Sequence, residues 1–489
     1  MLKWFVRTVG VLALVLVIAT SWAMWRTFGP LPPLPDYHAE LVALAESRLV
    51  EQQAWSGNHD RVQILDDIIE RLNIELQLAE GGEPDFSGFV ERPDEARAST
   101  VLDALQESGA IELVDSLEFA PPCVRTLDSA VPLIGSLYPD FGRARVVNAA
   151  FVFEMGEAIR AGDEQRATAA LRRSLLVAST FENTTSLIEF LVGGALRSQV
   201  IETLRAAVQR GDTDEAGLIR ALTRDFEAYV PNFELELAIA GERLMLKDTA
   251  GRLYRRDPEL QWLFDDDEYL GLRPSLHRLI ASEREIIATF DRVFDSYVHM
   301  AELPMYRQVR ALHRFDERFD EFELFSMRLG LVSILTPAVG NVIRRSNEQA
   351  IQIDATRLVL AIERFRLEHD GRLPTSLEEL VPDYLSRLPQ DPMCPDGRAY
   401  GFRAIDPGED AVWSAPQVDA PERGLATGYE STVPRTYLLW SIGVDGEDNG
   451  GTRYLGASWS SMDPANDRAV GTDYILNMPP FLPEDEQEQ

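Results

Sequence analysis

A glycine-rich acidic loop near the C-terminus holds the residues whose types and spacing best suit chemistry. Within 441–451, Asp445, Asp448 and Asn449 present oxygen side chains on a turn that the neighbouring glycines allow to curl tightly. Asp473 follows closely along the chain. Calcium, a hard cation, takes several oxygen ligands from loops of this kind. The pattern therefore predicts a calcium site with these four side chains as ligands.

A second explanation of the same residues is a metal-free turn. Asp and Gly are favoured in tight turns for their backbone preferences alone, and no ion is then required. Under the first explanation, Asp463 and Asp467 are further candidate ligands, because they lie between the loop and Asp473. Both explanations stay open at the level of sequence.

The rest of the chain lacks a motif that identifies a reaction. It has no nucleophile elbow, phosphate-binding loop, dinucleotide-binding glycine pattern or kinase motif set. The acidic run 265–268 places its carboxylates side by side, whereas calcium loops alternate their ligands, so a solvated loop is favoured. His277 lacks the spacing of a zinc-binding histidine pair. Cys123 and Cys394 lie far apart without a CxxC spacing, so we expect two unrelated small apolar side chains rather than a disulfide framework or a zinc site.

A long helix and a group of strands are expected to position the loop. From Ser346, apolar residues recur at steps of four and three up to Phe365, which predicts a helix with one buried face. Asp370 and Gly371 predict a left-handed turn that ends it. After this turn, Thr375 and Glu378 have the spacing of a capping box before a short helix.

Two bulky segments beyond the short helix, 399–403 and 436–441, predict strands that pack against the long helix. The proline turn 388–392 separates them from the short helix. From this order of elements we expect a small α+β unit over 346–480.

This order of motifs resembles the globular domain of type II secretion major pseudopilins. The phrase 369–375 is similar to the family's "DNG.YPT" helix end, 388–392 to its "LP.DPW" turn, and 441–451 to its closing "S.G.DG..GG" loop. The segment 406–434 is a less family-like insertion. In that family the corresponding loop binds calcium, so the resemblance implies a pseudopilin-like module at 346–480 and the same ion.

The chain departs from that family outside the module. Its N-terminus has no pseudopilin leader, and a long helical region precedes the module, so assembly into a fibre is not expected. The chain as a whole resembles large membrane-anchored proteins of bacteria with complex envelopes that carry the same C-terminal module. That second resemblance implies no activity.

The region 37–345 is helical in pattern almost throughout, with apolar residues at steps of three and four. Within 61–72, one face of the expected helix is apolar, formed by Ile64, Leu65, Ile68, Ile69 and Leu72, and the opposite face is charged. Short breaks at 162–163 and 211–214 predict antiparallel helical hairpins. No fixed period is found, so we expect an irregular helical array rather than a repeat protein. The apolar segment 329–343 contains Pro337 and predicts a kinked buried helix rather than a membrane span.

The N-terminus predicts an export signal. Lys3 and Arg7 precede an apolar run of about the length that spans a bilayer, and a signal anchor over 1–28 is favoured. Small residues at 21–23 leave a cleaved signal peptide as the alternative. The segment 29–36 is a stiff proline-rich spacer that would hold the next domain off the membrane, and 481–489 is an acidic tail.

The length and the net charge of the chain limit the number of domains and the classes of partner. The 489 residues suit two or three domains, and the net charge of -33 disfavours nucleic-acid binding. We expect a mainly α fold with an N-terminal membrane helix, a large irregular all-α domain of helical hairpins and a small α+β module.

The function expected from the sequence is a non-enzymatic scaffold. It would be a single-pass protein of the bacterial inner membrane, with its bulk in the periplasm and with other envelope or secretion proteins as partners. The alternative is an extracytoplasmic hydrolase whose carboxylate or histidine site lies in the helical domain and has no short motif.

Overall fold

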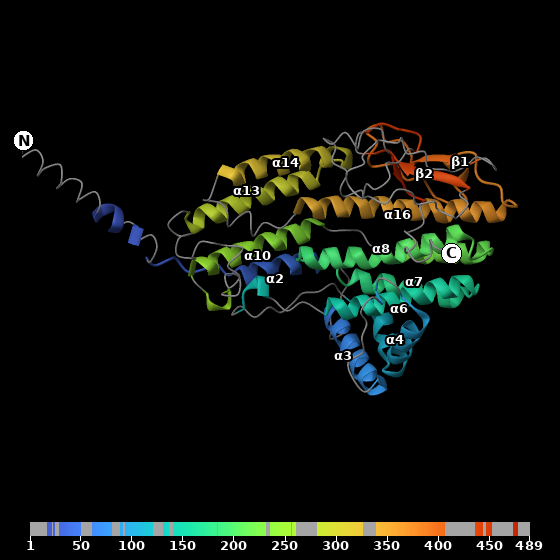
Figure 1. Ribbon diagram of the computed structural model, residues 1–489, viewed down its shortest axis with the longest axis horizontal. Helices are drawn as coiled ribbons and strands as arrows, with labels where there is room; N and C mark the ends of the chain where they lie inside the picture. Colours follow the sequence, from blue (N-terminus) through green and yellow to red (C-terminus); the bar gives the residue numbers. More distant parts are fainter. Residues whose placement is uncertain are drawn as a thin grey trace, which may run out of the picture.

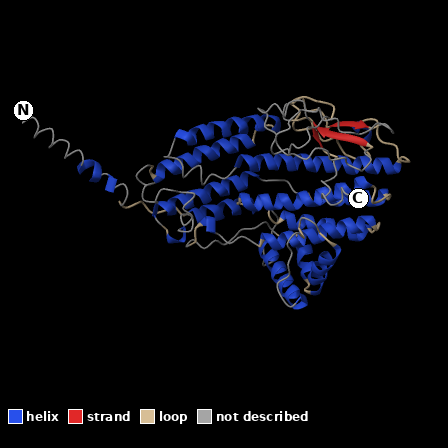
Figure 2. Ribbon diagram, in the orientation of Figure 1, coloured by secondary structure: helices blue, strands red, loops and turns tan. Residues whose placement is uncertain are grey.

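The computed structural model describes residues 17–21, 23–24, 29–49, 61–80, 89–90, 93–120, 131–135, 140–182, 184–230, 235–255, 257–260, 281–325, 339–405, 436–443, 446–451 and 473–477. These residues form a mainly helical protein with one small sheet (Figure 2), which confirms the expected fold class at this level. Within them, no helix is both long enough and apolar enough to cross a membrane. Most of the predicted anchor, 1–28, lies outside the described residues.

The elements follow in a simple order along the chain. The first group is α2 (Tyr37–Leu49), α3 (Arg61–Glu80), α4 (Glu95–Glu107), α5 (Ala110–Ser116), η1 (Leu133–Gly135), α6 (Phe141–Arg160), α7 (Glu164–Ser179), α8 (Leu187–Arg210), α9 (Ala216–Tyr229), α10 (Leu235–Arg255) and η2 (Pro258–Leu260). The second group is α13 (Glu283–Ala301), α14 (Met305–Phe325), α16 (Val339–Glu368), η3 (Leu377–Leu380), β1 (Gly401–Ala404), β2 (Tyr437–Ser441) and β3 (Tyr474–Ile475).

The helices pack as an irregular array of hairpins. Figure 1 shows α7, α8 and α16 side by side along the long axis, with α3 and α4 projecting from one side. The break predicted at 162–163 separates α6 from α7, and Asp163 caps α7 by accepting from the Arg166 amide. The break predicted at 211–214 separates α8 from α9. Both predicted breaks are confirmed, and α6 and α7 pack against each other as a hairpin.

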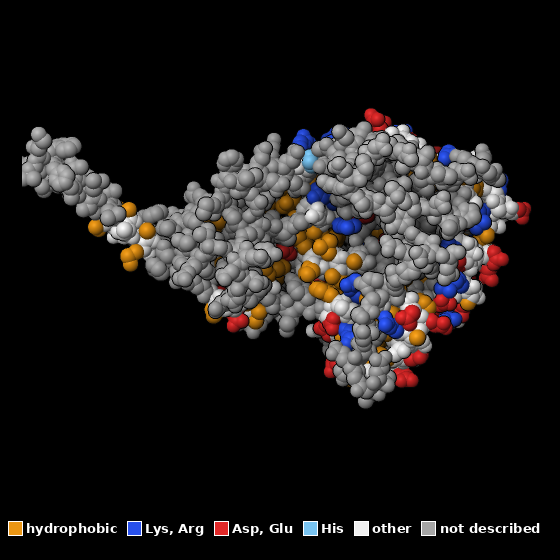
Figure 3. Space-filling model, viewed as in Figure 1, with side chains coloured by type: hydrophobic (Ala, Val, Ile, Leu, Met, Phe, Trp, Pro, Cys, Tyr) orange, Lys and Arg blue, Asp and Glu red, His pale blue; other side chains and the backbone are white. Residues whose placement is uncertain are grey.

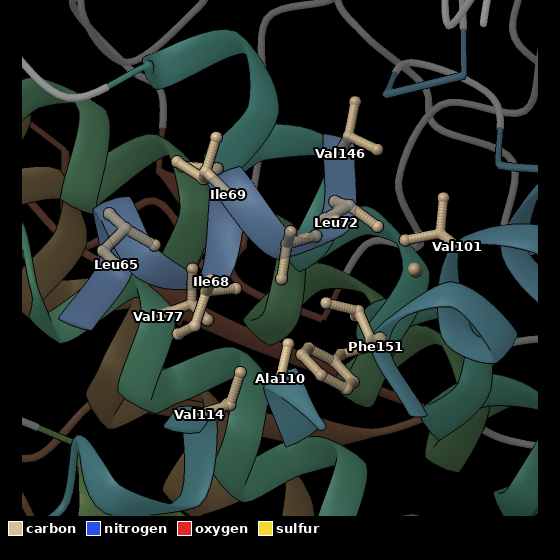
Figure 4. Close-up of a cluster of buried hydrophobic side chains, with 14 of the residues drawn as sticks. Leu65, Ile68, Ile69, Leu72, Val101, Ala110, Val114, Val146, Phe151 and Val177 are labelled. Atoms are coloured by element: carbon tan, nitrogen blue, oxygen red, sulfur yellow. The ribbon is translucent and has the colours of Figure 1, made fainter. Parts of the chain in front are cut away.

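The apolar face predicted for the start of α3 is buried in the array. Leu65, Ile68 and Leu72 are fully buried. Figure 4 shows them in the same cluster as Phe151 of α6 and Val177 of α7. The periodic pattern therefore marked both the helix and the face that it buries.

The segment 29–36 contains no helix or strand, in agreement with its proline content. It does not stand clear of the array, because Arg255 of α10 donates a hydrogen bond to the Pro32 carbonyl at 2.5 Å. That this segment holds the array off the membrane stays a prediction. Here the chain lies along α10.

The helix α16 joins the array to the sheet. It begins at Val339 rather than at the predicted Ser346, because its first turn packs into the core formed by α10 and α13. Farther along, Leu358 and Ile362 enter the core of the C-terminal module, whereas Leu360 enters the core of α6 to α9. The division at 345/346, which stays a prediction, falls inside this helix.

The end of α16 follows the sequence closely. Asp370 and Gly371 adopt the predicted left-handed conformation, with φ of 50° and 85°. The short helix that follows is the 3₁₀ helix η3, and the predicted pairing of Thr375 with Glu378 is wrong by one residue. The Thr375 amide instead donates to Glu379 at 2.7 Å. The tighter 3₁₀ turn brings this next side chain over the helix start.

The sheet has three antiparallel strands in the order β1-β2-β3. The strands predicted at 399–403 and 436–441 correspond to β1 and β2, and β3 was not predicted. Gly401 pairs with Trp440. A Cβ at Gly401 would lie 2.1 Å from the Trp440 ring, so glycine is required for this pairing.

Candidate functional site

Two of the motifs that carry the family resemblance meet at one buried carboxylate. Asp391, in the proline turn, is 2 % exposed. It accepts hydrogen bonds from the Met393 amide at 2.9 Å and from the Ser441 hydroxyl at 2.8 Å. Its second oxygen accepts from the Ile442 amide at 2.8 Å. Asp391 therefore fastens the proline turn to the end of β2, where the glycine-rich loop begins.

Burial is the main influence on this carboxylate. It raises the pKa of Asp391 to about 6, although the bonds from Met393, Ser441 and Ile442 favour the charged form and lower it. Ser441 is fully buried. A hydroxyl that donates to a carboxylate can act as a nucleophile, but this one has no surface for a substrate to reach. The geometry is that of a structural joint.

The glycine-rich loop is held by carboxylates in the same manner. Asp473 is fully buried and accepts from the amides of Asn449 at 3.0 Å and Gly451 at 2.7 Å. Asp448 accepts from the Trp440 indole nitrogen at 3.0 Å. The loop is thus closed on itself by bonds from its own backbone and from β2.

Three of the four predicted calcium ligands are described: the main-chain amide of Asn449 donates to Asp473, and the Asp448 side chain accepts from Trp440 and from the Gly450 amide. The fourth, Asp445, lies outside the described residues, as do Asp463 and Asp467. Within the part that the structure describes, no group of three His, Cys, Asp or Glu side chains is placed to hold a metal ion. Carboxylate oxygens that accept two amide bonds retain lone pairs for a cation. The calcium site stays a prediction.

Residues 473–477, here named the clasp, tie the sheet to α8. Arg205 donates to the Leu476 carbonyl at 2.8 Å, and Gln209 donates to the Asn477 carbonyl at 3.2 Å. Burial lowers the pKa of the Arg205 guanidinium. A buried guanidinium with this short bond to a main-chain carbonyl fixes the position of the clasp on the helix.

The clasp is equally tied to the sheet and to α16. The Asn477 side chain accepts from the Leu439 amide at 3.0 Å and donates to the Tyr437 carbonyl at 2.6 Å, which extends the pairing of β2. On the other side, Gln352 of α16 donates to the Tyr474 hydroxyl at 2.6 Å. One short segment therefore joins β2, α8 and α16.

A second set of buried charges lies inside the helical array. Glu182, before α8, and Arg197, on α8, form an ion pair in which both side chains are 1 % exposed. Burial raises the pKa of Glu182, while Arg197 and Arg61 lower it. Arg61 of α3 also donates to the Ala120 carbonyl at 2.9 Å. These charges link α3, α7 and α8 in the interior.

Glu242 of α10 lies at the start of α8 and is also buried. Burial raises its pKa to about 7, and a hydrogen bond from the Leu187 amide lowers it. Ser186, the residue at the N-cap of α8, makes no capping bond with its side chain. Glu242 therefore caps α8 from a neighbouring helix. A carboxyl with a pKa near neutrality is also suited to acid–base work.

The remaining sequence candidates are not brought together in the described structure. The acidic run 265–268, His277 and Cys123 lie outside the described residues. Cys394 is a buried free thiol, as expected of a small apolar side chain. His299 is exposed on α13. These positions add no group to the carboxylates described above.

Sequence reasoning missed the charges that hold the molecule together. The signal was present, because Arg197 and Arg205 fall in step with the buried apolar positions of α8, beside Leu196 and Leu204. A cation in such a helix has to meet a carboxylate or a carbonyl. The positions of its partners, Glu182 and Leu476, depend on the fold and have no local signal.

No protein-family model, curated protein sequence or solved structure matches this chain. The likeness to pseudopilins therefore rests on the motifs around Asp370, Asp391 and Ser441 and stays a prediction. The function proposed below is therefore based on the contacts of the buried carboxylates and of the clasp.

Proposed function

We propose that the chain is a non-enzymatic, membrane-anchored envelope protein whose helical array and C-terminal module act together as a binding scaffold. The observation that carries the proposal is the fixed attachment of the module to the array. α16 contributes to both cores, and the clasp is bonded to α8 through Arg205 and Gln209. A binding surface built across both parts keeps one geometry.

The buried carboxylates support the same proposal. Asp391 and Asp473 accept bonds from the main chain, and Glu182 is paired with Arg197. Each of these groups is used to join segments of the chain. A scaffold needs such joints, whereas an enzyme needs polar groups that converge where a substrate can reach them.

The location within the cell is proposed from the sequence. The positive residues before the apolar N-terminal run favour a single-pass anchor in the bacterial inner membrane, with the bulk of the chain in the periplasm. The C-terminal part is proposed to be a pseudopilin-like module. Envelope or secretion proteins are the partners that this location offers.

The proposal is tested in cells that make the full-length chain. Accessibility to protease added outside the inner membrane tests the location, and chemical crosslinking followed by purification tests for partners. We expect crosslinked envelope partners at a constant ratio to the chain, with the ratio reduced when Arg205→Met loosens the clasp. Arg310→Met, on the exposed face of α14, is the matched control. A protease-protected chain, or the absence of any partner at a constant ratio, contradicts the proposal.

Calcium binding is a second proposed property, and the bond from the Asn449 amide to Asp473, which links the loop to a further predicted ligand, supports it. An ion that binds the native state at 100 times its dissociation constant stabilises it by about 2.7 kcal/mol. Thermal unfolding of the full chain is expected to shift upward with calcium and to lose this shift in Asp445→Asn. An equal melting temperature with calcium and with a chelator removes the site and leaves the metal-free turn.

A hydrolase remains the alternative function, and Glu242 is the observation that favours it, because burial raises its pKa to about 7. The purified chain would then cleave at least one member of a panel of ester, peptide and glycoside substrates. Glu242→Gln would abolish that activity while the protein stays folded. If the wild-type chain and this variant are equally inactive across the panel, the hydrolase is rejected for Glu242 as the acid or base.

A further inference from the structure

Asp391 differs from the carboxylates on the surface of the molecule, because it meets no cation within the part of the chain that the structure describes. On the face drawn in Figure 3, acidic and basic side chains lie side by side over α6 and α7. Glu154 of α6, for example, pairs with Arg166 of α7 at 2.7 Å. The groups that donate to the buried Asp391 are two amides and a hydroxyl, all of them neutral. Arg398, in the same segment, lies 3.9 Å from Asp448 instead.

The other titratable groups around Asp391 give it no positive charge either. Tyr400 stays neutral, because burial and the charges of Asp354 and Asp391 raise its pKa well above the usual value. Its hydroxyl donates to Asp354 of α16 at 3.3 Å. Arg357 of α16 is bonded to Asp354 at 3.0 Å and to Glu227 of α9 at 2.8 Å. The charge of Asp354 adds to the effect of burial and raises the pKa of Asp391.

The Ser441 hydroxyl is placed to serve both protonation states of Asp391. Its oxygen lies 2.8 Å from the Asp391 carboxylate and 3.1 Å from the Ile442 carbonyl, and both of these groups are acceptors. When Asp391 is charged, the hydroxyl donates to it. When Asp391 holds a proton, its own O–H can donate to the serine oxygen while the serine hydroxyl turns to the Ile442 carbonyl. The oxygens of Asp391 still accept from the Met393 and Ile442 amides, so a proton can bind without the loss of a hydrogen bond.

We infer that Asp391 and Ser441 form a proton-binding site that holds the proline turn 388–392 more firmly against the end of β2 in acid than at neutral pH. In the closed joint, burial raises the pKa of Asp391 to about 6, whereas opening exposes the carboxyl to water and returns its pKa to the ordinary 3.8. Closure is therefore most favourable below the lower value, weakens as the pH rises to about 6 and is level above that. The inference concerns this joint alone and does not depend on the scaffold function.

Cys394 is the reporter of opening, because its thiol is buried and its amide donates to the Asp391 carbonyl at 3.0 Å. In the full-length chain with Cys123→Ser, it is the one cysteine left. Its rate of reaction with a pyridyl disulfide, which reacts with thiols in acid as well as at neutral pH, is divided by that of a short cysteine peptide at the same pH. This corrected rate measures how often the turn opens. We expect it to rise about tenfold from pH 5 to pH 8, with a midpoint near the pKa of about 6.

Two variants test which group holds the proton. Asp391→Asn has no charge to gain, so its corrected rate should be the same at both pH values within about twofold. Asp354→Asn removes the neighbouring negative charge, which makes Asp391 easier to ionise, and should move the midpoint to lower pH. Asp396→Asn is the matched control, because Asp396 is exposed on the same segment, and it should change neither the size of the rise nor its midpoint. Circular dichroism checks that the variants are folded.

Three results would overturn the inference. The first is a corrected rate in the Cys123→Ser chain that is equal at pH 5 and pH 8, or higher at pH 5. The second is a tenfold rise that persists in Asp391→Asn, because another group then binds the proton. The third is an unchanged midpoint in Asp354→Asn, which decides the matter even if Asp391→Asn does not fold.

Discussion

Buried carboxylates occur in both parts of the molecule, but they meet different partners. In the C-terminal module, Asp391 and Asp473 each accept from two main-chain amides. In the helical array, Glu182 is paired with the side chain of Arg197, and Glu242 accepts from a single amide, that of Leu187. The same chemical group is thus satisfied by the backbone in one region and by side chains or a helix end in the other.

Secondary structure explains the difference. Helices use their amides internally and leave only those of the first turn free, so a carboxylate among helices meets either a cation or a helix N-terminus. Glu242 at Leu187 is the second case, and Glu182 with Arg197 is the first. Loops and strand ends keep free amides, and Asp391 collects them. The partner of a buried acid is therefore set by the local backbone.

The largest expected effect tests the side-chain pair in the array. Glu182→Gln leaves the buried Arg197 guanidinium without its carboxylate, and we expect the free energy of unfolding to fall by about 4 to 5 kcal/mol. The double variant Glu182→Leu with Arg197→Met should recover most of this loss, because two apolar side chains replace both charges. Denaturant unfolding measures both variants. A double variant no more stable than Glu182→Gln would show that the pair has a role beyond neutralising charge.

The next effect tests the backbone-satisfied acid in the module. Asp391→Ala leaves the Met393 and Ile442 amides and the Ser441 hydroxyl without their acceptor, and a loss of about 3 to 4 kcal/mol is expected in denaturant unfolding. Asp396→Ala is the matched control, because Asp396 is exposed on the same segment. That change should stay within about 0.5 kcal/mol. Similar losses in the two variants would refute the role assigned to Asp391.

The comparison also shows which features a sequence can reveal. The α3 face, the hairpin turn at 162–163 and the left-handed turn at Gly371 follow from local spacing and turn chemistry, and these were predicted correctly. The strands β1 and β2 were predicted for the same reason. The start of α16 was not, because packing of Val339 against α10 and α13 extends the helix beyond its periodic stretch.

The contacts that Asp391 and the clasp make with distant parts of the chain could not be predicted from local sequence patterns. Asp391 was noticed only as part of a motif, and its bond to Ser441 crosses the insertion 406–434. The clasp was missed because β3 is too short to show a strand pattern, and Arg205 gives no indication of the carbonyl that it meets. Contacts between residues far apart in the chain are set by the fold, so a single sequence does not specify them.

The smallest expected effect is a pH dependence of the free energy of unfolding, and it tests the comparison at Glu242. Burial raises the pKa of Glu242 in the folded state to about 7, above the ordinary glutamate value of 4.5. The folded state then holds a proton that the unfolded state releases, so stability falls as pH rises from about 4.5 to about 7 and is level above that range. Glu242→Gln removes this titration while its amide oxygen still accepts from Leu187. The variant should gain up to about 2 to 3 kcal/mol on the wild-type chain between these two pH values. Denaturant unfolding at each pH measures the difference. A difference that does not change with pH would mean that Glu242 is charged in the folded state, and the contrast between the array and the module would then fail at this residue.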